Sequence, residues 1–228
     1  MASTAATVPG VVDPHVSHHH TSTGLDNRKI AIWAFIGSEC MLFACLISTY
    51  LIYKGRSLVG PYPHEAWTNP QTGVSYPAIL DIPVTSASTF VLLMSSLAMV
   101  LAHNAVVEKR KERHGTLQRM IGSSKLWLGA TAVLGLIFLG FQAYEFTAFV
   151  HEGLTIRTNL FGSSFFTLTG FHGAHVTVGV LWLGTLLAID MKRGLGPDDA
   201  LNVDLAALYW HFVDVVWIVI FPLVYLIT

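Results

Sequence analysis

Five apolar stretches, each long enough to cross a lipid bilayer, constrain what this chain can fold into more than any other feature. They cover residues 30–53, 84–106, 126–150, 160–189 and 203–227. A membrane-spanning helix needs about 20 apolar residues, and these stretches are far longer than the strands of a membrane barrel. The composition agrees, because 53% of the residues are hydrophobic and only 12% are charged. We therefore predict an all-α, polytopic membrane bundle of five transmembrane helices.

The lysines and arginines are divided unevenly between the two sides of such a bundle. Ten of the thirteen fall in the N-terminal flank and in the second and fourth loops. Only Lys54, Arg56 and Arg157 fall on the other side. Because positive residues accumulate in cytoplasmic loops, we predict a cytoplasmic N-terminus and an external C-terminus. The long first loop, rich in proline and glycine, is then external and is expected to be irregular.

The N-terminal segment differs in composition from the rest of the chain. Residues 1–27 are polar and lack the apolar core of a signal peptide, so we expect a flexible, uncleaved tail ahead of a transmembrane domain at 28–228. Its histidines, which either bind metal or are simply solvated, are His15, His18, His19 and His20. The net charge of −1 gives no reason to expect nucleic acid as a partner.

Glu39 is an acidic residue inside the first apolar stretch, IWAFIGSECMLFACLISTY. At 1.5 Å per residue it lies about 13 to 14 Å along the helix from Ile30, near mid-membrane on the cytoplasmic half. Its neighbours on the same helical face are apolar, so its partner must come from another helix, a lipid headgroup or water. Ionisable groups inside a span are costly and are functional candidates. Two roles stay open for Glu39: a hydrogen-bonded carboxyl that joins two helices, and a proton-handling group.

Three further spans each carry two polar residues that are three positions apart on one helical face. These residues are Gln142 and Glu145, His172 and His175, and His211 and Asp214. Glycines around the two histidines of the fourth span allow close helix approach, so we expect both histidines to face the interior of the bundle. Such residues suit an internal polar network between helices, and a purely structural role for it stays open.

The polar residues in the spans give little support for two other functions, cofactor binding and transport. A six-coordinate haem needs ligands on opposite sides of the ring, which His172 and His175 on one turn do not supply. A zinc site would need further ligands at matching depth. Five spans do not divide into two equal halves, and the inverted repeats common in transporters are not visible. We expect no metal and no cofactor in this chain.

Several segments occur in the order seen in subunit III of the haem-copper oxidases, and the chain resembles that family over residues 28–228. The segments are IGSECMLFA, AHNAVVEKRK, QAYEF, SFFTLTGFHGAHVTVG and YWHFVDVVW. Mitochondrial-type members have seven spans, so this chain resembles the shorter bacterial form with five.

The resemblance implies a non-catalytic subunit of cytochrome c oxidase in the bacterial plasma membrane. Such a subunit carries no haem or copper, packs directly on subunit I near a proton-uptake pathway, and binds phospholipid. Haem and copper are expected in partner subunits, including subunit II. The complex takes electrons from cytochrome c, reduces oxygen to water and pumps protons.

The resemblance also assigns roles to individual residues, none of them catalytic. Glu39 corresponds to the family's buried carboxylate, and Arg28 or Lys29 to a lipid headgroup contact at the cytoplasmic rim. The internal network corresponds to Gln142, Glu145, His172, His175, His211 and Asp214. Two relatives stay open as alternatives: subunit III of a quinol oxidase, whose ending is similar to WHFVDVVWIVIFPLVYL, and the accessory protein of nitric oxide reductases.

Overall fold

Five long helices account for most of the computed structural model, which describes residues 26–76, 78–107 and 123–227. The helices are α1 (Asn27–Tyr53), α2 (Ile82–Val107), α4 (Ser124–His151), α5 (Leu160–Arg193) and α6 (Ala200–Phe221), the last followed by a π-helical turn at Pro222–Leu226. All five are long and apolar enough to cross a membrane, which confirms the expected spans. Helix α5 continues four residues beyond the expected end at Ile189.

Local sequence signals fix where the helices begin and end. The Asp26 carboxylate accepts a hydrogen bond from the Arg28 backbone N–H at 2.8 Å and so caps α1. Asn159 caps α5 in the same way through the Gly162 N–H at 2.7 Å. Gly194, with φ of 74°, ends α5 in a backbone conformation that glycine adopts without strain.

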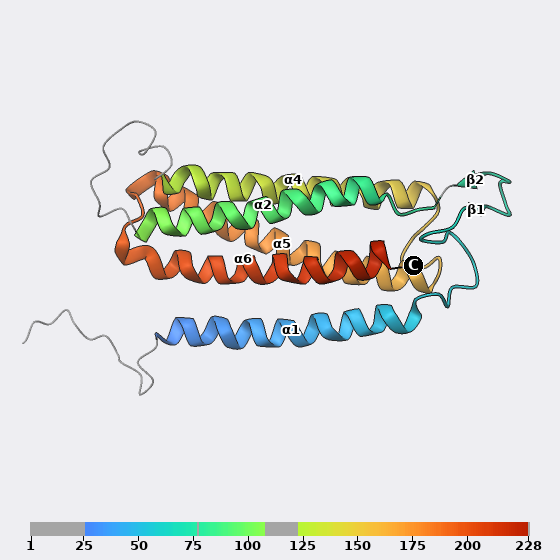
Figure 1. The fold of residues 1–228 in the computed structure, drawn as a ribbon, viewed down its shortest axis with the longest axis horizontal. Coiled ribbons are helices and arrows are strands. Elements are labelled where there is room, and N and C mark those ends of the chain that lie inside the picture. The colour runs from blue at the N-terminus through green and yellow to red at the C-terminus, as the bar shows by residue number, and fades with distance from the viewer. Residues whose placement is uncertain (1–25, 77, 108–122, 228) are drawn as a thin grey trace, which may run out of the picture.

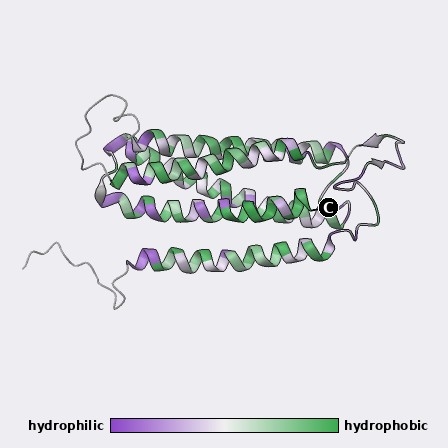
Figure 2. Ribbon diagram, viewed as in Figure 1, coloured by the Kyte–Doolittle hydropathy of each residue, from purple (hydrophilic) through white to green (hydrophobic). Residues whose placement is uncertain are grey.

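Helix α1 is attached to the bundle differently from the other four. Figure 1 shows α2, α4, α5 and α6 packed together with α1 alongside, and α1 contacts mainly α5 and α6. Its buried residues, Ile36, Phe43 and Tyr50, recur every seven positions and form one stripe. Figure 2 shows hydrophobic residues along most of α1, and Trp33 and Met41 lie exposed outside that stripe, as lipid or a partner helix requires.

Trp210 on α6 lies at a tightly packed point of the four-helix core. A Cβ atom on Gly135 of α4 would lie 2.6 Å from the indole, and one on Gly179 of α5 would lie 2.8 Å from it. The indole Nε1–H donates to Ser95 Oγ on α2 at 2.9 Å. One side chain thus contacts all three neighbouring helices, and the two glycines provide the space for it.

The loop between α1 and α2 is more ordered than its composition suggested. Residues Trp67–Thr68 (β1) and Ser75–Tyr76 (β2) form a small antiparallel hairpin with Trp67 opposite Tyr76. The two aromatic rings stack with centroids 6.2 Å apart. The expectation of an irregular loop was therefore wrong for this segment, because the cross-strand aromatic pair stabilises a hairpin.

The fold separates the loops into the two groups used to predict orientation. In Figure 1 the start of α1 and the α5–α6 connection lie at one end of the bundle, and the hairpin and the α4–α5 connection lie at the other. Lysines and arginines at 109–119, like the histidines of the tail, fall outside the described residues. Which end faces the cytoplasm stays a prediction.

Impermeant labelling of single cysteines tests this orientation. With Cys40 and Cys45 replaced by alanine, we expect Gln71→Cys in the hairpin loop to react from outside, and Asp198→Cys between α5 and α6 to react only after permeabilisation. Both positions are exposed in the structure, so neither is buried by the rest of this chain. Reaction of Asp198→Cys in sealed right-side-out vesicles would reverse the predicted orientation.

Candidate functional site

The Glu39 side chain meets His175 of α5 near the middle of α1. Glu39 Oε2 lies 3.1 Å from His175 Nε2, and the two side chains are 17% and 15% exposed. The Phe43 ring packs edge-on against the imidazole, with centroids 5.0 Å apart. The Tyr209 hydroxyl donates to the His175 carbonyl at 3.0 Å. Glu39 was expected to find its partner on another helix, in lipid or in water; the structure places His175 of another helix against it, and Ser38 of α1 also donates to Oε1 at 3.5 Å.

The hydrogen bonds of His175 determine how many protons this pair holds. Nδ1 lies 2.7 Å from the Phe171 carbonyl oxygen, which only accepts, so Nδ1 carries a hydrogen. A neutral ring of that tautomer offers only an acceptor at Nε2, and an ionised carboxylate is also only an acceptor. The contact with Glu39 therefore needs one additional proton, on Nε2 or on the carboxyl group. In both forms the pair has no net charge, which makes a carboxyl group tolerable inside an apolar span.

The ends of α1 are held by further polar contacts. Lys29 Nζ lies 2.7 Å from an Asp204 carboxylate oxygen of α6, and an Arg28 guanidinium N–H donates to Asn202 Oδ1 at 3.3 Å. The two residues expected to meet lipid headgroups thus contact α6, and they keep exposed surface as well. At the other end, Lys54 Nζ donates to the Ile227 carbonyl.

The two expected polar residues of α4 are both buried and bind different elements. Gln142 donates through its amide to the Thr169 carbonyl of α5 at 2.7 Å. Glu145 accepts from the Thr85 hydroxyl of α2 at 2.7 Å and from the Tyr225 hydroxyl of the π-helical turn at 2.9 Å. Glu145 thus joins three segments that are far apart in the sequence.

Two of the remaining expected residues, His172 and Asp214, also bond to other helices. The buried His172 Nε2 lies 3.2 Å from the Val213 carbonyl of α6. Asp214 accepts from the Ser96 hydroxyl of α2 at 2.6 Å. His211 is half-buried one turn before Asp214. His172 faces the interior as expected, whereas His175 lies at the contact with α1, so two histidines on one helical turn serve two different interfaces.

Sequence reasoning missed the hydroxyl groups of α2. Thr85 and Ser96 bind the carboxyl groups of Glu145 and Asp214, and Thr89 and Ser95 accept from the indoles of Trp217 and Trp210 at 2.9 Å each. Their signal was serines and threonines repeating on one face of an apolar span, a pattern typical of helix interfaces in membranes.

Asp190, near the end of α5, was also missed. It is fully buried and accepts from the Ser124 hydroxyl at 2.5 Å and from the Leu195 N–H at 2.8 Å. The residue lies one position beyond the expected end of the fourth span, so it was assigned to a loop. It connects the start of α4 to the end of α5.

The described residues contain no set of metal ligands. Across 26–76, 78–107 and 123–227, no three histidine, cysteine, aspartate or glutamate side chains come together closely enough to hold a metal ion. Many of the polar groups described above bond to other parts of the protein, whereas Gln142 Oε1, His172 Nδ1 and Asp214 Oδ1 are buried without a hydrogen-bond partner in the described part of the chain. Their arrangement is suited to joining helices and, at Glu39 and His175, to holding a proton.

Comparisons with known proteins agree on one family. Residues 10–228 match the family model described as cytochrome c oxidase subunit III. The chain is 40% identical over 202 residues to cytochrome c oxidase subunit 3 of Bacillus sp. (strain PS3), covering 88% of this chain and 86% of that protein. It is 35% identical over 219 residues to quinol oxidase subunit 3 of Bacillus subtilis (strain 168), covering 93% and 96%. It is 32% identical over 231 residues to cytochrome bo(3) ubiquinol oxidase subunit 3 of Pseudomonas aeruginosa, covering 98% of each.

A double-mutant cycle measures the contact between Glu39 and His175. We expect Glu39→Leu and His175→Leu each to lower the stability of the full-length chain in detergent, with a coupling energy of about 0.5–2 kcal/mol. Glu39→Gln should lower the stability less than Glu39→Leu, because the glutamine amide N–H donates to His175 Nε2 without an additional proton. Met41→Leu, on the exposed face of α1, is the control. Additive effects of the two leucine substitutions would show that the contact contributes nothing.

Proposed function

The chain belongs to the cytochrome c oxidase subunit III family, and from this premise we propose that it is a non-catalytic subunit of a cytochrome c oxidase. As a subunit III of a haem-copper oxidase, it works in a complex with other oxidase subunits. On this proposal it supports proton uptake by the catalytic subunit and that subunit's stability during oxygen reduction and proton pumping. Its five apolar helices fit a multi-pass membrane protein, and we place it in the bacterial plasma membrane.

On this proposal the redox chemistry takes place outside this chain. Haem and copper belong to partner subunits, with subunit I in direct contact, subunit II in the same complex and phospholipids around them. The bonding of His175 supports this division, because both of its ring nitrogens already have partners within the protein. A histidine ligates metal through a ring nitrogen that is free of other bonds.

The contact between Glu39 and His175 across two helices is the observation that carries the proposed role in proton uptake. The pair lies about 18 Å along α1 from its first residue, at 1.5 Å per residue, and both side chains keep some exposed surface. It is thus accessible from the lipid or from a neighbouring subunit. A proton can move between the two partners without creating net charge in the membrane.

The electron donor is the part of the proposal for which there is a second candidate. The 40% identity to a cytochrome c oxidase subunit favours cytochrome c. The quinol oxidase relative from Bacillus subtilis is only slightly less similar, at 35%, and it aligns over more of both chains. A quinol oxidase subunit III is therefore the second candidate, and the accessory protein of nitric oxide reductases is a more distant one.

Oxygen consumption by the purified complex separates the two donors. We expect turnover with reduced cytochrome c and little or none with a soluble quinol, and we expect the same preference after this chain is removed, since the donor binds other subunits. The control is an inhibitor of the haem-copper centre, which must stop consumption with either donor. Turnover with quinol alone would establish the quinol oxidase reading.

Glu39→Gln tests the role in proton uptake. Because Gln keeps the hydrogen bond but carries no titratable proton, we expect normal assembly and an initial oxygen-reduction rate close to that of the wild type. Over many turnovers we expect fewer protons released per electron or earlier inactivation. The measurement is oxygen consumption and proton release by the reconstituted complex, with Met41→Leu as control. Wild-type stoichiometry and lifetime would leave Glu39 with a packing role only.

A further inference from the structure

A pocket of about 300 Å³ lies beyond the end of α1, at the end of the bundle that carries the hairpin. Its wall comes from the end of α1, the following loop and the start of α5. The lining residues are Lys54, Gly55, Ser57, Tyr62, Pro63, His64, Glu65 and Phe161. The volume is at the lower end of the range for small-molecule sites, which suits a ligand the size of a phosphate group with a few attached atoms.

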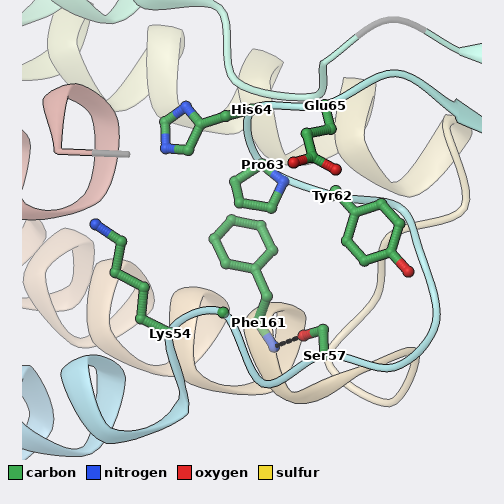
Figure 3. A pocket seen from close by; sticks show the side chains of 8 residues that line it. Lys54, Ser57, Tyr62, Pro63, His64, Glu65 and Phe161 are labelled. Carbon is green, nitrogen blue, oxygen red and sulfur yellow. Dashed lines mark hydrogen bonds between the residues drawn. The ribbon is translucent and has the colours of Figure 1, made fainter.

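The polar side chains are arranged unevenly around this pocket. Figure 3 shows the Lys54 ammonium group and the His64 ring on one side of the Phe161 ring, with Tyr62 and Glu65 on the other. Pro63 lies between the two groups (Figure 3). The pocket therefore has an apolar centre, with hydrogen-bond donors on one side and a carboxylate at its exposed rim.

Two nitrogen atoms on the side of Lys54 and His64 can form more hydrogen bonds than they make within the described part of the chain. Lys54 Nζ donates one hydrogen bond, to the Ile227 carbonyl, and an ammonium group has three hydrogens. His64 Nε2 is buried and makes no hydrogen bond within the described part of the chain. A buried polar atom without a partner is costly, because it has lost its bonds to water and gained none. Both nitrogens line the same pocket.

The pKa of His64 depends on the charges in and around the pocket. Burial, and secondly the positive charge of Lys54, lower the pKa of His64 below its usual value of 6.5. The imidazole is then neutral at pH 7, and Lys54 is the cation among the described lining residues. An anion placed between His64 and Lys54 would counteract the effects of burial and of the Lys54 charge on the pKa of His64, because it favours the charged imidazolium.

We propose that this pocket binds a phosphate group carrying one negative charge, with its oxygen atoms accepting hydrogen bonds from Lys54 Nζ and from the His64 ring. Glu65 at the rim disfavours a doubly charged ligand by repulsion. A phospholipid headgroup and dihydrogen phosphate both carry this chemistry. The site goes beyond the proposed function, because it involves neither the electron donor nor the Glu39–His175 pair.

Equilibrium dialysis of the purified oxidase complex, in phosphate-free buffer and detergent, tests the site with two labelled probes. One arm uses inorganic phosphate, and the other uses dihexanoyl phosphatidylglycerol, a soluble phosphodiester lipid. We expect Lys54→Gln and His64→Leu each to weaken binding of the preferred probe about tenfold, which corresponds to about 1.4 kcal/mol. Lys192→Gln is the matched control, since it removes the same charge at the exposed end of α5.

The two arms identify the source of the phosphate group. If Lys54→Gln and His64→Leu weaken binding of the lipid probe alone, the pocket is a headgroup site. If they weaken binding of inorganic phosphate alone, it is a site for the free ion. Equal affinity of wild type, Lys54→Gln and His64→Leu for both probes would overturn the proposal, as would an equal loss in Lys192→Gln. Oxygen consumption by each variant is measured in parallel, so that failure of this site is distinguished from failure of the proposed oxidase function.

The pH dependence provides a second, independent readout. Binding of the phosphodiester probe by the wild type should strengthen as the pH falls, because the charge of the probe itself does not change near neutral pH and the anion binds the protonated form of His64 more tightly. The other titratable groups lining the pocket are Lys54, Glu65 and Tyr62. His64→Gln keeps an N–H donor that does not titrate, so it should bind with less dependence on pH. An unchanged pH profile in His64→Gln would assign the effect to another group and contradict the proposed role of His64.

Discussion

Hydrogen bonding between helices in an apolar medium is the constraint on which the rest of this structure depends. A polar side chain inside a span has no water to bind, so it must find its partner on another helix or be left unsatisfied at high cost. Trp210, Trp217, Asp214 and Glu145 all do so through hydroxyl groups of α2. The largely apolar α2 thus supplies the small polar groups that fix how α4 and α6 rotate and where they lie along its length. Dispersion packing alone would leave several arrangements of the helices close in energy. The reason is that an apolar helix surface packs as well against lipid tails as against another helix.

Helix α1 follows the same rule with fewer contacts. One stripe of buried residues and four polar contacts attach it to α5, α6 and the last residues of the chain. The contacts are Glu39 with His175, Lys29 with Asp204, Arg28 with Asn202, and Lys54 with Ile227. They lie at the middle and the two ends of the helix, so together they determine its tilt and its rotation. The other faces of α1 remain apolar and exposed in the isolated chain, as Trp33 and Met41 illustrate. Because packing against this chain is sparse, the polar contacts carry a larger share of its attachment than in the four-helix core.

The sequence predicted the spans, the division of loops between the two ends, and the polar residues worth attention, but it did not predict their partners. Spacing such as that of His172 and His175 shows which residues share a helical face, and it does not show how that helix is rotated against its neighbours. A rotation that buries His172 completely leaves His175 at the edge of the same face, where α1 covers it. Likewise, nothing near Glu39 in sequence indicated a partner 136 positions away. The α2 hydroxyls were overlooked because serine and threonine are tolerated in apolar spans, where they also bond to their own backbone. The hairpin was overlooked because a stacked Trp67 and Tyr76 outweighs a loop composition rich in proline and glycine.

The position of Glu39 and His175 links their proton to the placement of α1. Each partner belongs to a different rigid helix, and His175 is held independently of Glu39 by its bond to the Phe171 carbonyl. A shift of α1 by an ångström or two would therefore lengthen the Glu39 contact without moving the histidine, and the electrostatic benefit of sharing one proton would fall with distance. An unpaired carboxylate at this depth is costly, so separation of the pair must be accompanied by retention of the proton on Glu39 or by a new partner for it. Whatever covers the exposed face of α1, a lipid or a neighbouring subunit, thus influences the state of this proton by setting where α1 lies.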